Sequence, residues 1–182
     1  MQEQENETAI SLDWKLAATK TFQLSICVAL AFAAPYFLNQ LITGSIVNAL
    51  LFISASTLGL ESAFLLCLIP SLISIYTGLL PLSLAPMIPF IMTGNALLVL
   101  VFSKMTNPTS LKFRGARNFW LGATSAAFIK FIFIWSAGMI LANSILHGIS
   151  KSVLLMISWP QFATSIAGAC IAFLFLKIIK KI

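Results

Sequence analysis

The sequence predicts an all-α integral membrane protein, a compact bundle of six transmembrane helices with both termini in the cytoplasm. Three observations support this fold class: composition, apolar runs and charge placement. Hydrophobic residues make up 59% of the 182 positions, charged residues 9%, and mean hydropathy is +0.99. A soluble domain carries about 25% charged residues, so this chain could not keep its surface hydrated in water. The apolar residues fall in six runs, and the basic residues gather between them.

Each run approaches the length that crosses a bilayer, because a hydrocarbon core about 30 Å thick needs roughly 20 apolar residues in a helix. The connection between the third and fourth runs contains Pro81, Pro86 and Pro89, and we expect it to be irregular. Irregular backbone at the membrane is tolerated only where it is buried in protein or lines a cavity, so this connection is a candidate for the lid or lip of a binding site. The six runs cover approximately residues 20–38, 41–60, 62–80, 89–103, 119–146 and 153–176.

The chain divides into a short polar segment and one membrane domain. Residues 1–17 carry four acidic side chains, so we expect a disordered cytoplasmic tail and not a cleavable signal peptide. Residues 18–182 form a single six-helix transmembrane domain. Its longest polar interval, residues 104–118, is expected to be a basic cytoplasmic loop.

The basic residues set the orientation. Two lie before the first run, four between the fourth and fifth, and three after the sixth, of eleven in the chain. With six spans these places share one side, and cytoplasmic loops are enriched in Lys and Arg, so both termini are expected to be cytoplasmic. Lys151 is on the other side, and Lys130 lies inside the fifth run. The basic loop is an orientation signal and not a nucleic-acid surface, while contact with a cytoplasmic partner or anionic lipid stays open.

The remaining composition argues against enzymatic chemistry. Cys27, Cys67 and Cys170 lie scattered in apolar runs without paired spacing, which is typical of small buried hydrophobes. His147 has no second histidine with which to bind a metal, and the chain lacks the G-x-x-x-x-G-K-[ST] loop of an ATPase. We therefore expect no catalytic residues, no metal site and no cofactor.

Lys130 is the most informative residue. It follows Phe119 by eleven positions, which places it about 16 Å into the membrane. A charge there costs at least ~2.5 kcal/mol and marks a functional candidate. Ala123, Ala126 and Ala127 share its helix face, so the lysine should point into the bundle. No acidic residue lies at its depth. A ligand role and a structural hydrogen-bonding role both stay open.

Two amides occupy similar positions, and further polar residues gather near the outer ends of the runs. Asn48 and Asn95 must find partners if buried, either on another helix or in a polar cavity that opens outward. Trp159 near the outer rim fits interfacial anchoring but could also wall a ligand. The candidate substrate-binding residues are Asn39, Gln40, Thr43, Asn48, Asn95, Lys130, Trp159 and Gln161.

Three phrases carry a family resemblance that extends from Lys20 over most of the chain. They are "QLITGSIVNA" at 40–49, "PLSLAPMIPFIMTGNALL" at 81–98 and "PQ" at 160–161. With six spans and no attached ATPase, the chain resembles the S component, the substrate-binding subunit, of an energy-coupling factor (ECF) transporter. It is similar in particular to a branch with Q-x-x-T-G-x-x-V-N-A and P-P-L-A-P-x-x-P-F-I-x-x-G-N-A-L motifs, and it departs from that branch at Ser83.

The resemblance implies a multi-pass protein of the bacterial plasma membrane that captures a vitamin or other micronutrient from outside. It implies, as partners, a transmembrane coupling protein and two cytoplasmic ATPase subunits, besides membrane lipid, and no nucleic acid. Docking in this family uses an Ala-x-x-x-Ala motif on the first helix, which Ala29 and Ala33 match here. Ordinary internal packing would equally explain such a face.

Other functions stay open. A passive channel or facilitator could use Lys130 and the amides to line a pore, and an assembly factor would bind no ligand. An intramembrane enzyme is the weakest alternative, because no paired carboxylates or Ser–His set share a depth. Uptake that requires a co-expressed coupling module would favour the S component, and unaided uptake would favour the channel.

Overall fold

The computed structural model describes residues 2–106, 115–144 and 154–180, with side chains from Trp14 onward. The prediction of an all-helical fold is confirmed, since these residues contain six helices of at least 17 residues and no strand. Two 3-10 helices, η1 (Ala34–Phe37) and η2 (Leu82–Met87), join them. The helices are α1 (Gln2–Ala33), α2 (Gln40–Thr57), α3 (Leu60–Tyr76), α4 (Ile88–Thr106), α5 (Ala116–Ser144) and α7 (Trp159–Ile178).

Five helical segments are long and apolar enough to cross a membrane, which confirms a multi-pass membrane protein. The sixth, α3, is apolar but has 17 residues, a length of about 26 Å. The last helix starts at Trp159, later than the predicted 153, because Pro160 suits a helical first turn. The five segments are Trp14–Phe37, Gln40–Thr57, Leu82–Thr106, Ala116–Ser144 and Trp159–Ile178.

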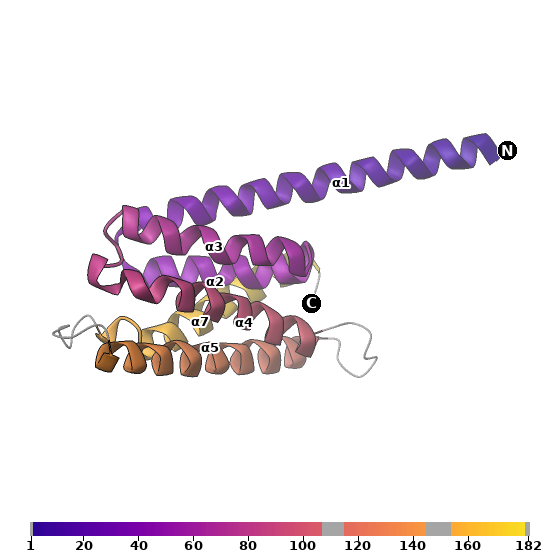
Figure 1. Ribbon diagram of the computed structural model, residues 1–182. Helices are drawn as coiled ribbons and strands as arrows, with labels where there is room; N and C mark the ends of the chain where they lie inside the picture. The colour runs from indigo at the N-terminus through magenta and orange to yellow at the C-terminus, as the bar shows by residue number, and fades with distance from the viewer. Residues whose placement is uncertain (1, 107–114, 145–153, 181–182) are drawn as a thin grey trace.

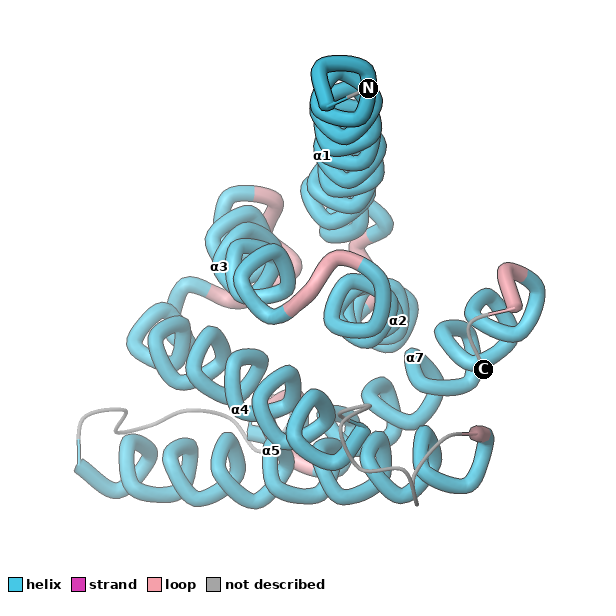
Figure 2. Tube along the Cα trace, turned by 90° about the vertical axis from the view of Figure 1, so that its right-hand side faces the viewer, coloured by secondary structure: helices cyan, strands magenta, loops and turns pink. Residues whose placement is uncertain are grey.

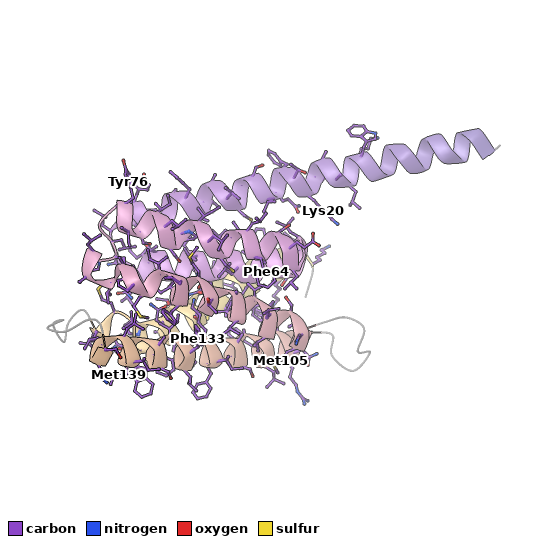
Figure 3. All side chains as sticks on the ribbon, viewed as in Figure 1. Lys20, Phe64, Tyr76, Met105, Phe133 and Met139 are labelled. Carbon is purple, nitrogen blue, oxygen red and sulfur yellow. The ribbon has the colours of Figure 1, made fainter. Side chains whose placement is uncertain are left out.

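Successive helices run in opposite directions, so both chain ends lie at the same end of the bundle (Figure 1). We call the half of the bundle nearer the chain ends the proximal half, and the other the distal half. Lys20 and Met105 lie toward the proximal end, and Tyr76 and Met139 toward the distal end (Figure 3). His147 and Lys151 lie outside the described residues, as do three of the basic residues counted above, Lys112, Arg114 and Lys181.

Helix α1 lies at the edge of the bundle. Viewed end-on, α2 and α3 separate it from the layer of α4 and α5 (Figure 2), and its N-terminal part projects beyond the other helices (Figure 1). The prediction of a disordered tail at residues 1–17 is at odds with the structure, in which α1 begins at Gln2. The physical reason is local, because this segment lacks Gly and Pro and contains several good helix formers.

The Pro-rich connection is also more ordered than predicted. Residues Leu82–Met87 form the 3-10 helix η2, with Pro86 inside it, and α4 follows directly. Pro89 is the second residue of α4, where its missing N–H removes no helical hydrogen bond. Leu84 and Met87 are completely buried, in a cluster that includes Ile134 of α5. The connection is therefore a packed element that fixes the distal end of α4.

Aromatic rings in edge-to-face and tilted contacts pack together in the proximal half. The ring centroid of Phe102 lies 4.8 Å from that of Phe52 and 5.3 Å from that of Phe119, in edge-to-face contacts. Phe173 lies 5.4 Å from both Phe119 and Trp120. We call these five residues the aromatic cluster. Edge-to-face ring pairs stabilise a core beyond the area they bury, so this half of the bundle is closely packed.

Candidate functional site

A cavity lies in the distal half, between α2, α3, α4, α5 and the start of α7. The space open to the centre of a water molecule is about 90 Å³. Its apolar wall includes Val47, Leu79, Leu80 and Ile91. Its polar lining comes from the same five helices, and consists of Gln40, Thr43, Asn48, Ser71, Ser74, Asn95, Lys130 and Gln161.

A hydrogen-bonded chain joins three helices at the inner end of this cavity. Lys130 on α5 is 2% exposed, and its Nζ donates to Asn48 Oδ1 on α2 at 2.6 Å. Asn48 Nδ2 donates in turn to Thr164 Oγ1 on α7 at 3.4 Å. The hydrogen bond from Lys130 fixes the orientation of the Asn48 amide, because only the amide oxygen can accept from the ammonium. The predicted inward direction of Lys130 agrees with this arrangement, and Ala123, beside it, is completely buried.

Two glycines allow α2 and α7 to approach closely enough for this chain. A Cβ added to Gly168 would lie 2.7 Å from the backbone nitrogen of Ala49, and one added to Gly44 would lie 2.9 Å from Thr164 Cβ. Contacts this short are not tolerated, so the helices could not keep their spacing with larger residues. Small residues at a crossing are the usual means of close helix packing in membranes. Asn48 and Thr164 meet because of this close approach.

Asn95, on α4, lies against the turn of α3 that precedes Pro70. It is 3% exposed, and its Nδ2 donates to Cys67 O at 3.5 Å. Pro70, in the interior of α3, has no N–H to donate to the carbonyl one turn earlier. The buried Ser71 follows it and lines the cavity. Ser71 was missing from the predicted site, and the available signal was a Pro-Ser pair within an apolar run.

The mouth of the cavity is held by two amides from different helices. Gln40 at the start of α2 and Gln161 at the start of α7 both donate to the carbonyl oxygen of Met156, the latter at 3.1 Å. Thr43 donates to Ala34 O at 2.9 Å, which ties α2 to η1. These residues therefore combine a position at the cavity with a structural hydrogen bond.

Two predicted binding residues lie outside the cavity lining. Asn39 caps α2, with its Oδ1 accepting from Leu41 N at 3.0 Å and from Ile42 N at 3.2 Å. Trp159 is 57% exposed at the first turn of α7, an environment that fits interfacial anchoring. The other six candidates, Gln40, Thr43, Asn48, Asn95, Lys130 and Gln161, surround one cavity.

The predicted docking residues Ala29 and Ala33 are exposed on α1, whereas Ala31 and Ala34 are buried. Within the described residues, Ala31 and Ala34 therefore take part in internal packing, whereas Ala29 and Ala33 stay accessible.

The electrostatics of the cavity are one-sided. The sequences of α2, α4, α5 and α7 contain no Asp or Glu, and Glu61 of α3 lies in the first turn of that helix, at the proximal end. Lys130 therefore has no carboxylate partner on the helices around it. In the part of the chain that the structure describes, no three His, Cys, Asp or Glu side chains come together as metal ligands. The lining residues can bind a small molecule through hydrogen bonds and one positive charge.

Comparison of the chain with protein-family models, with curated proteins and with solved structures finds no match. The resemblance to S components therefore depends on the sequence motifs. The geometry of the cavity provides a second basis for proposing a function, separate from the motifs.

Proposed function

We propose that this chain is a substrate-binding subunit that captures a small molecule within the membrane, as the S component of an ECF-type transporter does. The distal half would face the outside and the two chain ends the cytoplasm. One observation carries the proposal. Polar side chains from five helices, with Lys130 at the inner end, line one cavity inside the bundle. A cavity with an apolar wall and a few convergent polar groups is typical of a small-molecule site.

The inner boundary of the cavity supports binding over passive conduction. Phe52 follows Asn48 by one helical turn and is completely buried, and Phe102 follows Asn95 by two turns and is 1% exposed. The aromatic cluster thus lies between the cavity and the proximal end. A channel for polar solutes would need polar or open space there. A closed inner end suits a protein that holds its ligand until a partner changes its conformation.

The position of α1 supports the need for a partner. Ala29 and Ala33 lie exposed on a helix at the edge of the bundle (Figure 2). Small residues four positions apart let a second helix approach closely. The two cytoplasmic ATPase subunits that such a coupling protein carries would supply the ATPase activity for which this chain has no G-x-x-x-x-G-K-[ST] motif.

The test is to identify what the protein holds. The full chain, purified in mild detergent, is analysed by native mass spectrometry and its released small molecules are characterised. We expect a bound small molecule that is lost in Ile91→Trp, which fills the cavity. Ile171→Trp, at a position that is 46% exposed on α7, is the matched control and should keep it. An equal ligand content in both variants, or none in the wild type, contradicts the proposal.

A further inference from the structure

We infer that the ligand is a small organic monoanion whose carboxylate pairs with Lys130 and whose short apolar body faces Leu79, Leu80 and Ile91. This inference deepens the proposed function and rests on it, because it takes the cavity as the ligand site. Four features of the described residues lead to it: the charge of the site, the orientation of Asn48, the cavity volume and the position of the apolar wall.

The first feature is the positive charge of Lys130. Lys130 is 2% exposed, and the helices that carry its neighbours contain no Asp or Glu except Glu61 at the far end of α3. A buried cation is stable only when it is paired and hydrogen-bonded. An ammonium group has three donors, and among the described residues Asn48 Oδ1 is the acceptor found for it. Two donors are therefore available for the two oxygens of a carboxylate.

The orientation of Asn48 excludes a cationic ligand at this position. Its Nδ2 is engaged by Thr164 Oγ1, and Thr164 Oγ1 itself donates to Pro160 O at 2.8 Å. The amide oxygen therefore stays directed at Lys130 and cannot turn away to receive an ammonium ligand. Such a ligand would also meet the lysine charge directly, and like charges in a poorly hydrated cavity repel strongly.

The cavity volume favours a small molecule, because the inner space beside Lys130 is narrow. A single water requires ~10–15 Å³ of space measured in the same way, so about 90 Å³ has room for on the order of six to nine such groups. One lysine balances one negative charge. A monocarboxylate with a few carbon atoms fits this space and this charge, whereas a di- or triphosphate carries more negative charge than one lysine balances.

The apolar wall gives the orientation of the ligand. Ile91 precedes Asn95 by one turn on α4, and Leu79 and Leu80 come from the segment that leads to η2. All three lie on the distal side of the Asn48–Lys130 pair. The carboxylate therefore points inward to Lys130, and the carbon chain lies toward the mouth, where its burial contributes about 0.8 kcal/mol per CH₂ group, about fourfold in affinity.

The experiment compares matched probes on the purified full chain. Binding of acetate, butyrate and hexanoate, of the corresponding primary amides and of the corresponding alkylammonium ions is measured by calorimetry and by thermal unfolding. We expect the carboxylates to bind ~10- to 100-fold more tightly than the amides, which is the effect of one charge-assisted hydrogen bond. Alkylammonium ions should not bind. Equal affinity for carboxylates and amides overturns the anion assignment.

A second variant separates a ligand role of Lys130 from a structural one. Asn48→Asp keeps the shape of the side chain and places a carboxylate where Asn48 Oδ1 lies, 2.6 Å from Nζ. This internal anion should neutralise Lys130 and weaken carboxylate binding ~10- to 100-fold while the protein stays folded. Asn39→Asp is the control, because Asp caps α2 equally well outside the cavity.

The failures of the two proposals are distinguishable. Undiminished carboxylate binding in Asn48→Asp, or no carboxylate binding at any chain length, overturns the inference about the ligand class. The proposed function survives either result if a neutral molecule co-purifies with the wild type and is lost in Ile91→Trp. It fails if the cavity variant changes no ligand content at all.

Discussion

The two halves of the bundle are built from the same helices but in opposite ways. In the proximal half, α2, α4, α5 and α7 each direct aromatic rings inward, and Phe52, Phe102 and Phe119 are at most 3% exposed. One to three turns farther along, the same helices direct Asn48, Asn95 and Lys130 at a hollow. The proximal half is packed with aromatic rings, and the distal half contains the cavity. A substitution should therefore affect stability or binding according to the half in which it lies.

The largest expected effect is on stability, in the proximal half. Phe102→Ala removes a buried ring that packs edge to face on both Phe52 and Phe119, and truncation of a buried Phe lowers the free energy of unfolding by about 3–5 kcal/mol. The folded fraction should bind ligand as the wild type does. Denaturant titration in detergent with parallel calorimetry checks both. Phe175→Ala, at a 43% exposed position, should change neither quantity much. A large loss of affinity without loss of stability would show that the proximal half also contributes to ligand binding.

The second effect concerns the outer face of α1, which belongs to neither half. Ala29→Trp or Ala33→Trp should abolish docking to a coupling protein, at least ~100-fold in affinity, because a large side chain prevents close helix approach. Ligand binding by the isolated protein should survive. Co-purification with the coupling protein checks this, with Phe22→Trp, at a 67% exposed position, as the control. Unchanged co-purification would remove these alanines from the docking surface.

The smallest of the three effects lies in the distal half. Lys130→Ala should weaken ligand binding by ~10- to 100-fold, most of all for an anionic ligand, since a charge-assisted hydrogen bond is lost. Lys130→Arg keeps the charge and should recover part of the affinity, which calorimetry on both variants would measure. Wild-type affinity in Lys130→Ala would show that the lysine has a structural role and does not bind the ligand.

The sequence predicted the features that follow from apolar length and helix periodicity. The inward direction of Lys130 could be predicted because alanines at spacings of three and four mark a helix face that packs against other helices. The helix order and the grouping of six of the eight candidate residues follow from their depth in the runs. Asn39 and Trp159 were misplaced because depth alone does not give the direction of a side chain at a helix start.

Other features depend on tertiary contacts that no local pattern records. The Gln40 and Gln161 amides meet at Met156 O, which precedes α7 and comes close to α2 only in the folded bundle. The ordered η2 depends on burial of Leu84 and Met87 against α5. Ser71 resembled the many membrane serines that bond their own helix backbone, as Ser74 does to Pro70 O at 2.6 Å.

The length of α3 has a consequence for the surrounding lipid. A helix of about 26 Å is shorter than a hydrocarbon layer of about 30 Å, and local thinning of the bilayer is one response to such a mismatch. Tyr76 ends this helix and is 83% exposed, a side chain suited to the headgroup level. Because Ser74, Leu79 and Leu80 border the cavity at the same end, local thinning there would bring bulk water closer to the entrance. A charged solute could then reach the pocket with little passage through hydrocarbon.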